Sequence, residues 1–336
     1  MIRIVLIDDE SASRAGIAQL LRESRFEVAA AVPSTGDSIG VVREQAPHLI
    51  VISATVVRAE ALTRELMIAA PRPVVVVMGT RHPASEEISM RVLAAGALAF
   101  LSAPIEGSGA DEGAKGRFAA TLDALSQVRV VRQWAPRSPV VKNRGAQRFR
   151  VVVLAASTGG PKAVSTVLAG LPTTFAAPIL LVQHMALGFL PGFVEWLNQQ
   201  TPLRVQVAKP GDALLPGNVY VAPEDAHLGV TSSMTVLVES SPPVGGFRPA
   251  ATFLFDSAAR ELGNATLALV LTGMGSDGAP GAQAIHGAGG FVIAQDESTS
   301  VVFGMPAAAI ERGCADEILP LDEIAGRLVH WVGHTE

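Results

Sequence analysis

The first third of the chain alternates short apolar runs with longer stretches of mixed polarity. The apolar runs are rich in β-branched residues and lack the every-other-residue alternation of a half-exposed strand. This pattern predicts strands buried on both faces with helices between them, as in a parallel α/β sheet. We expect strands at Ile2–Ile7, Glu27–Val32, Leu49–Ile52, Val74–Met78 and Leu98–Leu101, and helices near residues 12–24, 36–45, 58–70, 85–95 and 114–128.

Residues 129–148 interrupt this alternation. The stretch 129–150 contains two prolines, seven Lys or Arg residues and no acidic residue. Because such charge runs are usually solvated, we predict an interdomain linker over 129–148, between domains at 1–128 and 149–336. A basic patch for an acidic partner or a membrane is the alternative.

The α/β alternation then restarts. We expect strands at Val151–Ala156, Ile179–Gln183, Arg204–Val207, Asn218–Val221, Thr235–Val238, Leu267–Thr272 and Phe291–Ala294, and helices near 161–169, 191–200, 251–262, 279–287, 306–312 and 321–332. The strands between 204 and 238 are close together, so we expect a β-hairpin excursion there. The predicted fold class is α/β: an N-terminal (βα)5 doubly wound sheet, then a doubly wound, mostly parallel α/β domain with that hairpin.

Composition narrows the functional classes. A length of 336 residues suggests about two domains at roughly 150 residues each. The net charge of −5 argues against a nucleic-acid-binding surface over the whole protein. The apolar runs are too short for a signal peptide or a membrane span, and the single cysteine, Cys314, allows no internal disulfide. We therefore expect a cytoplasmic protein without membrane insertion, and an ordinary core or surface thiol at Cys314.

Three predicted strands of the second domain end in reactive side chains. Ser157 follows the first strand and precedes a Gly-Gly-Pro helix start, His184 follows the second strand, and Asp277 lies in a glycine-rich turn after another. Active residues of open α/β sheets gather at these strand ends. A hydroxyl, an imidazole and a carboxylate at one sheet edge can act as nucleophile, general base and orienting group.

Each of these residues also has an ordinary structural interpretation. Ser157 could cap a helix or cradle a phosphate, His184 could be a hydrogen-bonded, half-buried histidine, and Asp277 could form a turn or cap a helix. His227 and His286 compete as histidine candidates, but neither ends a predicted core strand. Spacing alone leaves these alternatives open.

Five segments carry a family resemblance. They are AASTGGPKA (155–163), QHM (183–185), PPVGGFRP (242–249), LTGMGSDGAPG (271–281) and VVFGMP (301–306). In this order they resemble the catalytic domain of the chemotaxis protein-glutamate methylesterase family (CheB-type), over nearly all of 151–330. The resemblance implies a serine hydrolase that needs no cofactor and removes methyl esters from glutamates on the cytoplasmic helices of chemoreceptors. Some members of the family also deamidate glutamines there.

The resemblance also implies roles for individual residues. Ser157 would be the nucleophile, His184 the base and Asp277 the group that orients the histidine. Thr158 and the backbone near Met274 would help to form the oxyanion site. The side chains of Met185 and Met274 would line the active site.

Two positions depart from the family pattern. Ala155 stands where the family usually has glycine, which could crowd the serine turn. Phe247 stands in a loop where relatives often carry a histidine. Because that loop is expected to help receive the receptor helix, Phe247 bears on substrate choice more than on chemistry.

The first domain resembles a response-regulator receiver with several parts missing. Asp8 and Asp9 follow the first strand, where such a pair holds Mg²⁺ through its oxygens. We treat them only as weak metal candidates and expect no metal, because the phosphoacceptor position after the third strand is Ser53 rather than aspartate. Ala103 replaces the expected lysine, and Met78 or Gly79 replaces the expected Ser/Thr.

These replacements predict a pseudo-receiver, because serine cannot form the acyl phosphate that a receiver aspartate takes from a kinase. The leading reading is a receptor methylesterase with a regulatory domain that is not phosphorylated, and a chemotaxis-type kinase complex is a further expected partner. A non-enzymatic adaptor that binds receptor helices or another partner is the alternative, and a glutamine deamidase would use the same triad.

Overall fold

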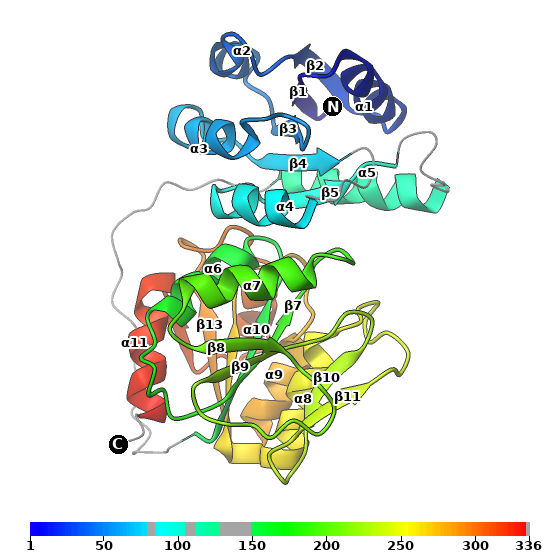
Figure 1. Cartoon of the computed structure of the whole chain (residues 1–336). Helices are drawn as coiled ribbons and strands as arrows, with labels where there is room; N and C mark the ends of the chain where they lie inside the picture. The colour runs from blue at the N-terminus through cyan, green and yellow to red at the C-terminus, as the bar shows by residue number, and fades with distance from the viewer. Residues whose placement is uncertain (79–84, 105–111, 128–148, 334–336) are drawn as a thin grey trace. The chain divides into compact units, whose positions relative to one another are not determined.

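Two separately folded parts make up the chain (Figure 1). The computed structural model describes residues 1–78, 85–104, 112–127 and 149–333. The compact units are Met1–Val130 and Val131–Glu336, and each is described by itself. The linker predicted over 129–148 lies outside the described residues.

The N-terminal unit is a five-stranded parallel sheet in the order β2-β1-β3-β4-β5. This is the order of flavodoxin-like doubly wound folds. The runs LIVIS and VVVVM are buried along their whole length, as a sheet covered on both faces requires. The elements are β1 (Arg3–Ile7), α1 (Ser11–Glu23), β2 (Glu27–Val32), α2 (Ser38–Gln45), β3 (Leu49–Ser53), α3 (Ala59–Ala69), β4 (Val74–Met78), α4 (Ser85–Ala94), β5 (Ala99–Ser102) and α5 (Glu112–Ser126).

The C-terminal unit contains a seven-stranded sheet in the order β14-β13-β12-β6-β7-β9-β8, parallel throughout. Its strands are β6 (Val151–Ala156), β7 (Ile179–Gln183), β8 (Arg204–Val207), β9 (Asn218–Val221), β12 (Thr266–Val270), β13 (Phe291–Gln295) and β14 (Glu317–Leu319). Its helices are α6 (Gly160–Ala169), α7 (Leu190–Gln200), α8 (Ala251–Leu262), the 3-10 turn η1 (Gly263–Ala265), α9 (Ala279–Gly287), α10 (Met305–Glu311) and α11 (Leu321–Val332). The predicted fold class is confirmed for both units.

The strand pattern explains how the helices cover this sheet. Side chains alternate between the two faces of a strand. Val151, Val153 and Ala155 of β6 therefore pack in one buried cluster with the apolar sides of α8 and α9. The central strands place the polar residues that follow them at one edge of the sheet.

The structure contains a hairpin, but only one of its strands, β11 (Val236–Glu239), corresponds to a strand expected in the excursion. β10 (His227–Val230) and β11 pair antiparallel in a separate two-stranded sheet. The strands at 204–221, which we assigned to the excursion, instead continue the parallel sheet as β8 and β9. Sequence analysis missed β10, whose HLGV sequence is a weak strand signal because of its glycine, and β14, which is only three residues long.

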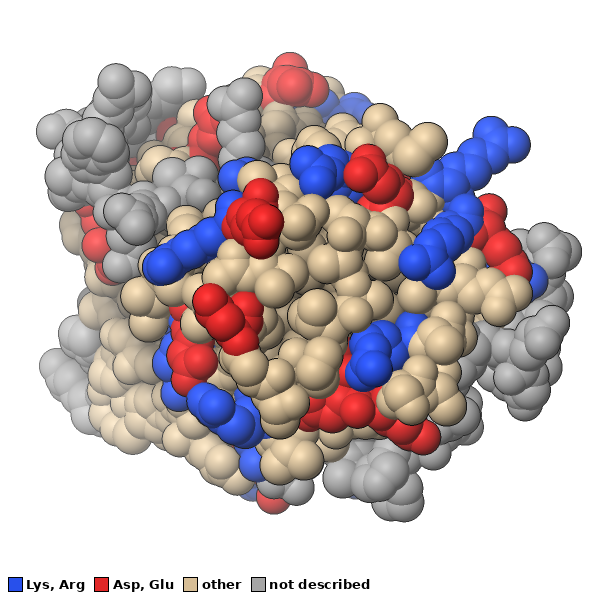
Figure 2. Space-filling model, turned by 90° about the horizontal axis from the view of Figure 1, so that it is seen from above, with Lys and Arg blue, Asp and Glu red and all other residues tan. Residues whose placement is uncertain are grey.

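Charged side chains are well mixed on the face drawn in Figure 2. Lys and Arg alternate with Asp and Glu there, and uncharged surface separates the groups. Among the residues coloured in that view, no continuous field of one sign forms. Within the described ranges, every helix is too short or too polar to cross a bilayer.

Candidate active site

Two neighbouring strands bring Ser157 and His184 to the same edge of the sheet. Ala156 of β6 pairs in register with Gln183 of β7, so the residues that follow them start from adjacent positions. The Gln183 side-chain amide donates to the backbone carbonyls of Ser157 (2.9 Å) and His184 (2.8 Å). The His184 N–H donates to the Ala156 carbonyl at 3.0 Å. These bonds fix the two strand ends relative to each other.

The turn that carries Ser157 depends on glycine. Gly159 has φ +76°, and a Cβ there would lie 2.5 Å from Cβ of Val301. Only glycine meets both demands, the left-handed backbone and the close approach. The Ser157 N–H donates to the Thr272 carbonyl at 3.0 Å, which ties the turn to the end of β12. Ser157 is half-buried at the edge of the sheet.

Asp277 reaches the same edge from β12, on the other side of β6. Its Oδ2 accepts from the N–H of Ala251 (2.7 Å). Its Oδ1 accepts from the N–H (2.9 Å) and hydroxyl (2.7 Å) of Thr252 and from the N–H of Gly278 (2.8 Å). Two of these donors are the first backbone amides of α8, so Asp277 caps a helix far from it in sequence. The positive end of that helix favours the carboxylate.

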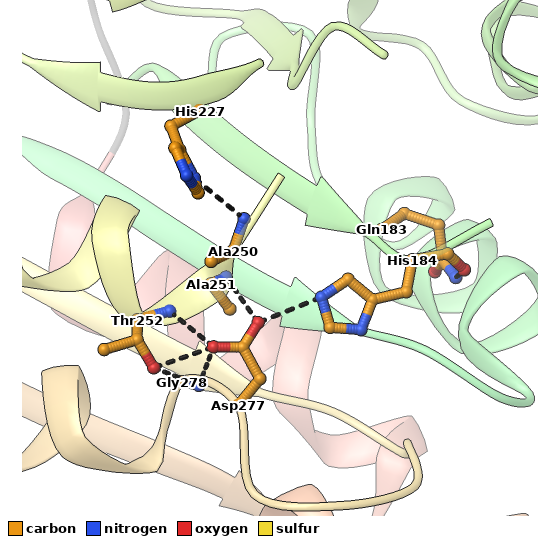
Figure 3. Close-up of polar contacts among 8 residues, drawn as sticks. All are labelled: Gln183, His184, His227, Ala250, Ala251, Thr252, Asp277 and Gly278. Carbon is orange, nitrogen blue, oxygen red and sulfur yellow. Dashed lines mark hydrogen bonds and ion pairs between the residues drawn. The ribbon is translucent and has the colours of Figure 1, made fainter. Parts of the chain in front are cut away.

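The Asp277 carboxylate also meets the imidazole of His184. Oδ2 lies 2.9 Å from Nε2. Figure 3 draws this contact as a dashed line between the two side chains. Burial alone would raise the pKa of Asp277, but the hydrogen bonds from His184 and Thr252 outweigh burial and hold that pKa below its ordinary value. A carboxylate only accepts hydrogen bonds, so Nε2 of the imidazole carries the proton.

The other ring nitrogen of His184 is left without a partner. Nδ1 is buried and forms no hydrogen bond within the described part of the chain. With the proton on Nε2, Nδ1 presents a free lone pair. The Ser157 hydroxyl forms no hydrogen bond to it in this structure, although the two residues follow adjacent strands. Such contacts often tighten only when substrate binds.

The residues expected at the oxyanion site flank this centre. The backbone N–H groups of Thr158 and Met274 form no hydrogen bonds to the described residues. The Thr158 carbonyl, in the peptide after the one that carries its N–H, accepts from the Thr272 hydroxyl at 3.0 Å. Met274 is 41% exposed and Met185, directly after His184, is half-buried.

The sequence assigned no role in this site to Gln183 or Thr252, and it linked Phe247 to substrate choice rather than to the histidine. Gln183 clamps the strand ends, Thr252 binds the carboxylate, and the Phe247 ring stacks on the His184 imidazole with ring centroids 4.4 Å apart. Gln183 had a detectable signal, a polar residue at the end of an apolar strand. The other two meet the site only through tertiary folding.

The competing histidines serve other contacts. His227 is fully buried, accepts from the Ala250 N–H at 3.2 Å through Nδ1, and has Nε2 3.2 Å from the Pro242 carbonyl (Figure 3 draws the first bond). His286 pairs with Asp316 at 3.3 Å. Neither contacts Asp277.

The edge of the N-terminal sheet holds a different polar cluster. Asp8 is fully buried, and its Oδ1 accepts from the Thr55 hydroxyl at 3.1 Å. Ser53, also fully buried, shares a 2.8 Å hydrogen bond with that hydroxyl. Asp9 turns away and binds the backbone N–H and hydroxyl of Ser34.

These residues do not fit the Mg²⁺ that receiver folds imply. Oδ2 of Asp8 is buried without a hydrogen-bond partner among the described residues, and Asp9 is bound to Ser34. In the residues that the structure describes, no group of three or more His, Cys, Asp or Glu residues could hold a metal ion. We derive no metal-dependent step from this edge.

Known proteins with this architecture identify the family. A model described as CheB methylesterase matches residues 152–328. A protein-glutamate methylesterase/protein-glutamine glutaminase of Myxococcus xanthus is 40% identical over 97% of this chain and 96% of its own length. Another, from a Rhizobium meliloti group 3 operon, is 45% identical over 78% of this chain and 76% of its own.

A solved structure agrees with these sequence matches. The catalytic domain of the Thermotoga maritima CheB methylesterase is 41% identical, with a TM-score of 0.52, and the match covers 54% of this chain and 97% of that domain. The family match covers more than half of the chain, and the relatives extend it over nearly the full length. The chain belongs to the CheB methylesterase family.

Proposed function

We propose that this chain is a serine hydrolase that cleaves glutamate methyl esters on the cytoplasmic helices of chemoreceptors and deamidates glutamines there. One observation carries the proposal: the imidazole of His184 is held by an ionised Asp277 and keeps a free Nδ1, and His184 and Ser157 directly follow two paired strands of the sheet. The names of the relatives, which cite both activities, support the choice of substrate.

Acylation uses the three side chains in sequence. The Ser157 oxygen attacks the ester carbonyl carbon while its proton passes to Nδ1 of His184, and the resulting imidazolium is stabilised by the Asp277 carboxylate. The tetrahedral intermediate then collapses. The bond to the methoxy oxygen breaks, and that oxygen takes the proton from His184 and leaves as methanol.

Deacylation repeats these steps with water. His184 accepts a proton from the attacking water, and the Ser157 oxygen leaves with that proton, which regenerates the hydroxyl and frees the glutamate. A glutamine substrate follows the same path and loses ammonia in place of methanol. The free N–H groups of Thr158 and Met274 are the proposed donors to the oxyanion, and losing one such donor costs roughly 3–4 kcal/mol of transition-state stabilisation.

The active-site rim suits a substrate that sits on a helix surface. Leu187 is 68% exposed and Met274 is 41% exposed, and both are on loops that follow the strands bearing the site. Met185 and Met274 would contact the apolar part of the glutamyl side chain. Methionine adapts to irregular apolar surfaces, which favours this role.

The N-terminal unit is, on this proposal, a receiver that is not phosphorylated. Ser53 occupies the acceptor position, is fully buried and is hydrogen-bonded to Thr55. Ala103 takes the place of the lysine that would bind a phosphate. Regulation, on this proposal, comes from binding a partner rather than from phosphorylation, a constitutively active esterase being the alternative, and a kinase complex of the chemotaxis type is the proposed partner. The protein would act in the cytoplasm, where those receptor helices lie.

A two-product assay tests the substrate assignment. The full-length protein is incubated with two receptor fragments that carry either glutamate methyl esters or glutamines at the modified positions, and methanol and ammonia are measured. We expect methanol from the first and ammonia from the second. Release of neither product, with both fragments folded as helices, would refute the proposal and favour a binding role.

A further inference from the structure

We propose that Phe247 is a positioning residue for the general base: its ring fixes the plane of the His184 imidazole and so sets the reactivity of Ser157. The inference rests on the proposed function, because it assumes that His184 is the base. It assigns to Phe247 a role in the chemical step, where the sequence suggested only an effect on substrate choice.

The two rings lie face to face. Their centroids are 4.4 Å apart and their planes differ by only 4°. The hydrogen bond from Nε2 to Asp277 fixes the imidazole at one edge but leaves it free to rock about that bond. A flat ring packed against one face opposes that rocking, and it excludes water from the same face. The aromatic ring and the carboxylate therefore restrain different motions of one side chain.

A tight turn sets the position of Phe247. Val244 and Phe247 exchange N–H to carbonyl hydrogen bonds, both 3.0 Å long. Gly245 and Gly246 between them have φ +60° and +87°, the signs that a two-residue type I′ turn requires. A Cβ at either glycine would meet no atom within 4 Å, so backbone conformation rather than space demands glycine here.

Neighbouring contacts hold this turn against the body of the domain. Arg248 donates twice to Oδ1 of Asp225, at 2.9 and 2.6 Å, and once to the Ser241 carbonyl at 3.2 Å. His227 accepts from the Ala250 N–H and has its other nitrogen 3.2 Å from the Pro242 carbonyl. The segment 241–250 is thus tied on both sides of Phe247.

The same segment leads directly into the support of Asp277. After Ala250 the chain enters α8, whose first residues Ala251 and Thr252 bind that carboxylate. One anchored segment therefore supplies both the ring that packs on the imidazole and the amides that hold its hydrogen-bond partner. This continuity favours a positioning role over a chance surface contact for Phe247, which is 37% exposed.

The test separates base positioning from substrate docking by using a probe with no receptor part. A small fluorophosphonate reacts with an activated serine, with the serine oxygen forming the bond to phosphorus and fluoride leaving. Labelling of Ser157 is followed by intact-protein mass in the full-length protein, in Phe247→Leu, and in the matched aromatic control Phe247→Tyr. Leucine keeps apolar bulk without a flat face, whereas tyrosine keeps the face.

We expect Phe247→Leu to slow labelling about tenfold or more, because small misplacements of catalytic groups carry penalties of that order, while Phe247→Tyr stays within about threefold of the parent. In methanol release, Phe247→Leu should lower kcat and leave KM nearly unchanged. Equal labelling by Phe247→Leu and the parent, a loss confined to KM, or equal losses in both variants would each overturn the proposal. Failure of the parent protein itself to label would refute the proposed function instead.

A measurement on the parent protein tests the proposal without depending on whether the Phe247 variants fold. A phenyl ring stacked on an imidazole shifts the carbon-bound imidazole protons upfield in the ¹H spectrum. Long-range ¹H–¹⁵N correlation, with His184→Gln for assignment, should show that shift for His184. If the imidazole protons of His184 instead had the chemical shifts of a solvent-exposed histidine, the two rings would not be stacked in solution, and the proposal would fail.

Discussion

At the scale of single residues, Asp277 lies in an environment very different from that of a free side chain. Its carboxylate accepts bonds from two helix amides, a hydroxyl, the amide of Gly278 and the imidazole. These donors hold the pKa of Asp277 below its ordinary value of 3.8 despite burial. The negative form is therefore the one that the folded protein selects.

This selection predicts how stability depends on pH. A carboxyl whose pKa is lower in the folded state contributes stability in full above its unfolded pKa, and that contribution is lost as the pH falls through the folded pKa. The free energy of unfolding of the parent and of Asp277→Asn can be measured in urea from pH 6 downward. We expect the difference between the two free energies to stay constant down to about pH 4 and to become smaller below that pH. A difference that stays constant down to acid unfolding would show that the pKa is not depressed.

The hydroxyl of Thr252 provides a more local test. Thr252→Val removes the 2.7 Å bond to Oδ1 of Asp277 and keeps the backbone N–H that also binds it. A hydrogen bond to a charged group is worth about 1.5 kcal/mol, so kcat for methanol release should fall roughly tenfold at unchanged KM. Thr252→Ser, which keeps the hydroxyl, is the control and should retain most of the activity. Full activity in Thr252→Val would show that this hydroxyl does not hold the carboxylate in its working position.

The residues that sequence reasoning could find are those attached to strands. Ser157, His184 and Asp277 each follow an apolar run, and parallel strands end at one edge, so strand recognition predicts that they share an edge of the sheet, whereas their roles came from the family resemblance. Thr252 and Phe247 come from a helix start and a loop, whose approach to the site depends on packing between distant segments. No local pattern encodes that approach.

At the scale of elements, the turn from β6 into α6 requires glycine for two separate reasons. An alanine at position 159 would need a left-handed backbone and would overlap Val301. Gly313 has a similar φ of +68°, but a Cβ there meets open space. Comparing the alanine variants at these two positions therefore distinguishes the effect of backbone strain from that of steric overlap.

We expect Gly313→Ala to cost about 1–2 kcal/mol of unfolding free energy through strain alone. Gly159→Ala should cost clearly more and should also abolish labelling of Ser157, because the turn that presents the serine must shift. Thermal unfolding and labelling of both variants measure this difference. Equal stability losses with normal labelling in Gly159→Ala would contradict the role assigned to the turn.

The elements themselves were predictable where they are long and apolar. The strands Val151–Ala156, Ile179–Gln183, Arg204–Val207 and Asn218–Val221 occur with the predicted bounds. The partner of each strand was harder to predict. β8 and β9 look like hairpin strands because only ten residues separate them, yet they pair in parallel within the main sheet.

At the scale of the whole molecule, the proposal that the N-terminal unit is a receiver without an acceptor aspartate can be tested through the esterase rate. If Ser53 replaces the phosphorylated residue, beryllofluoride with Mg²⁺ should leave the methanol-release rate of the full-length protein unchanged. A receiver protein that retains its aspartate, treated in parallel, confirms that the reagent is active. Clear stimulation of this esterase would show that another residue accepts the phosphoryl mimic.

The most direct test of the account is the rate of methanol release from a methylated receptor fragment by the parent protein and by Ser157→Ala. Ser233→Ala, which removes an exposed hydroxyl in the hairpin, serves as the matched control. We expect the rate of methanol release to fall by about a thousandfold or more in Ser157→Ala and to match that of the parent in Ser233→Ala. Methanol release by Ser157→Ala at a rate near that of the parent would contradict the account.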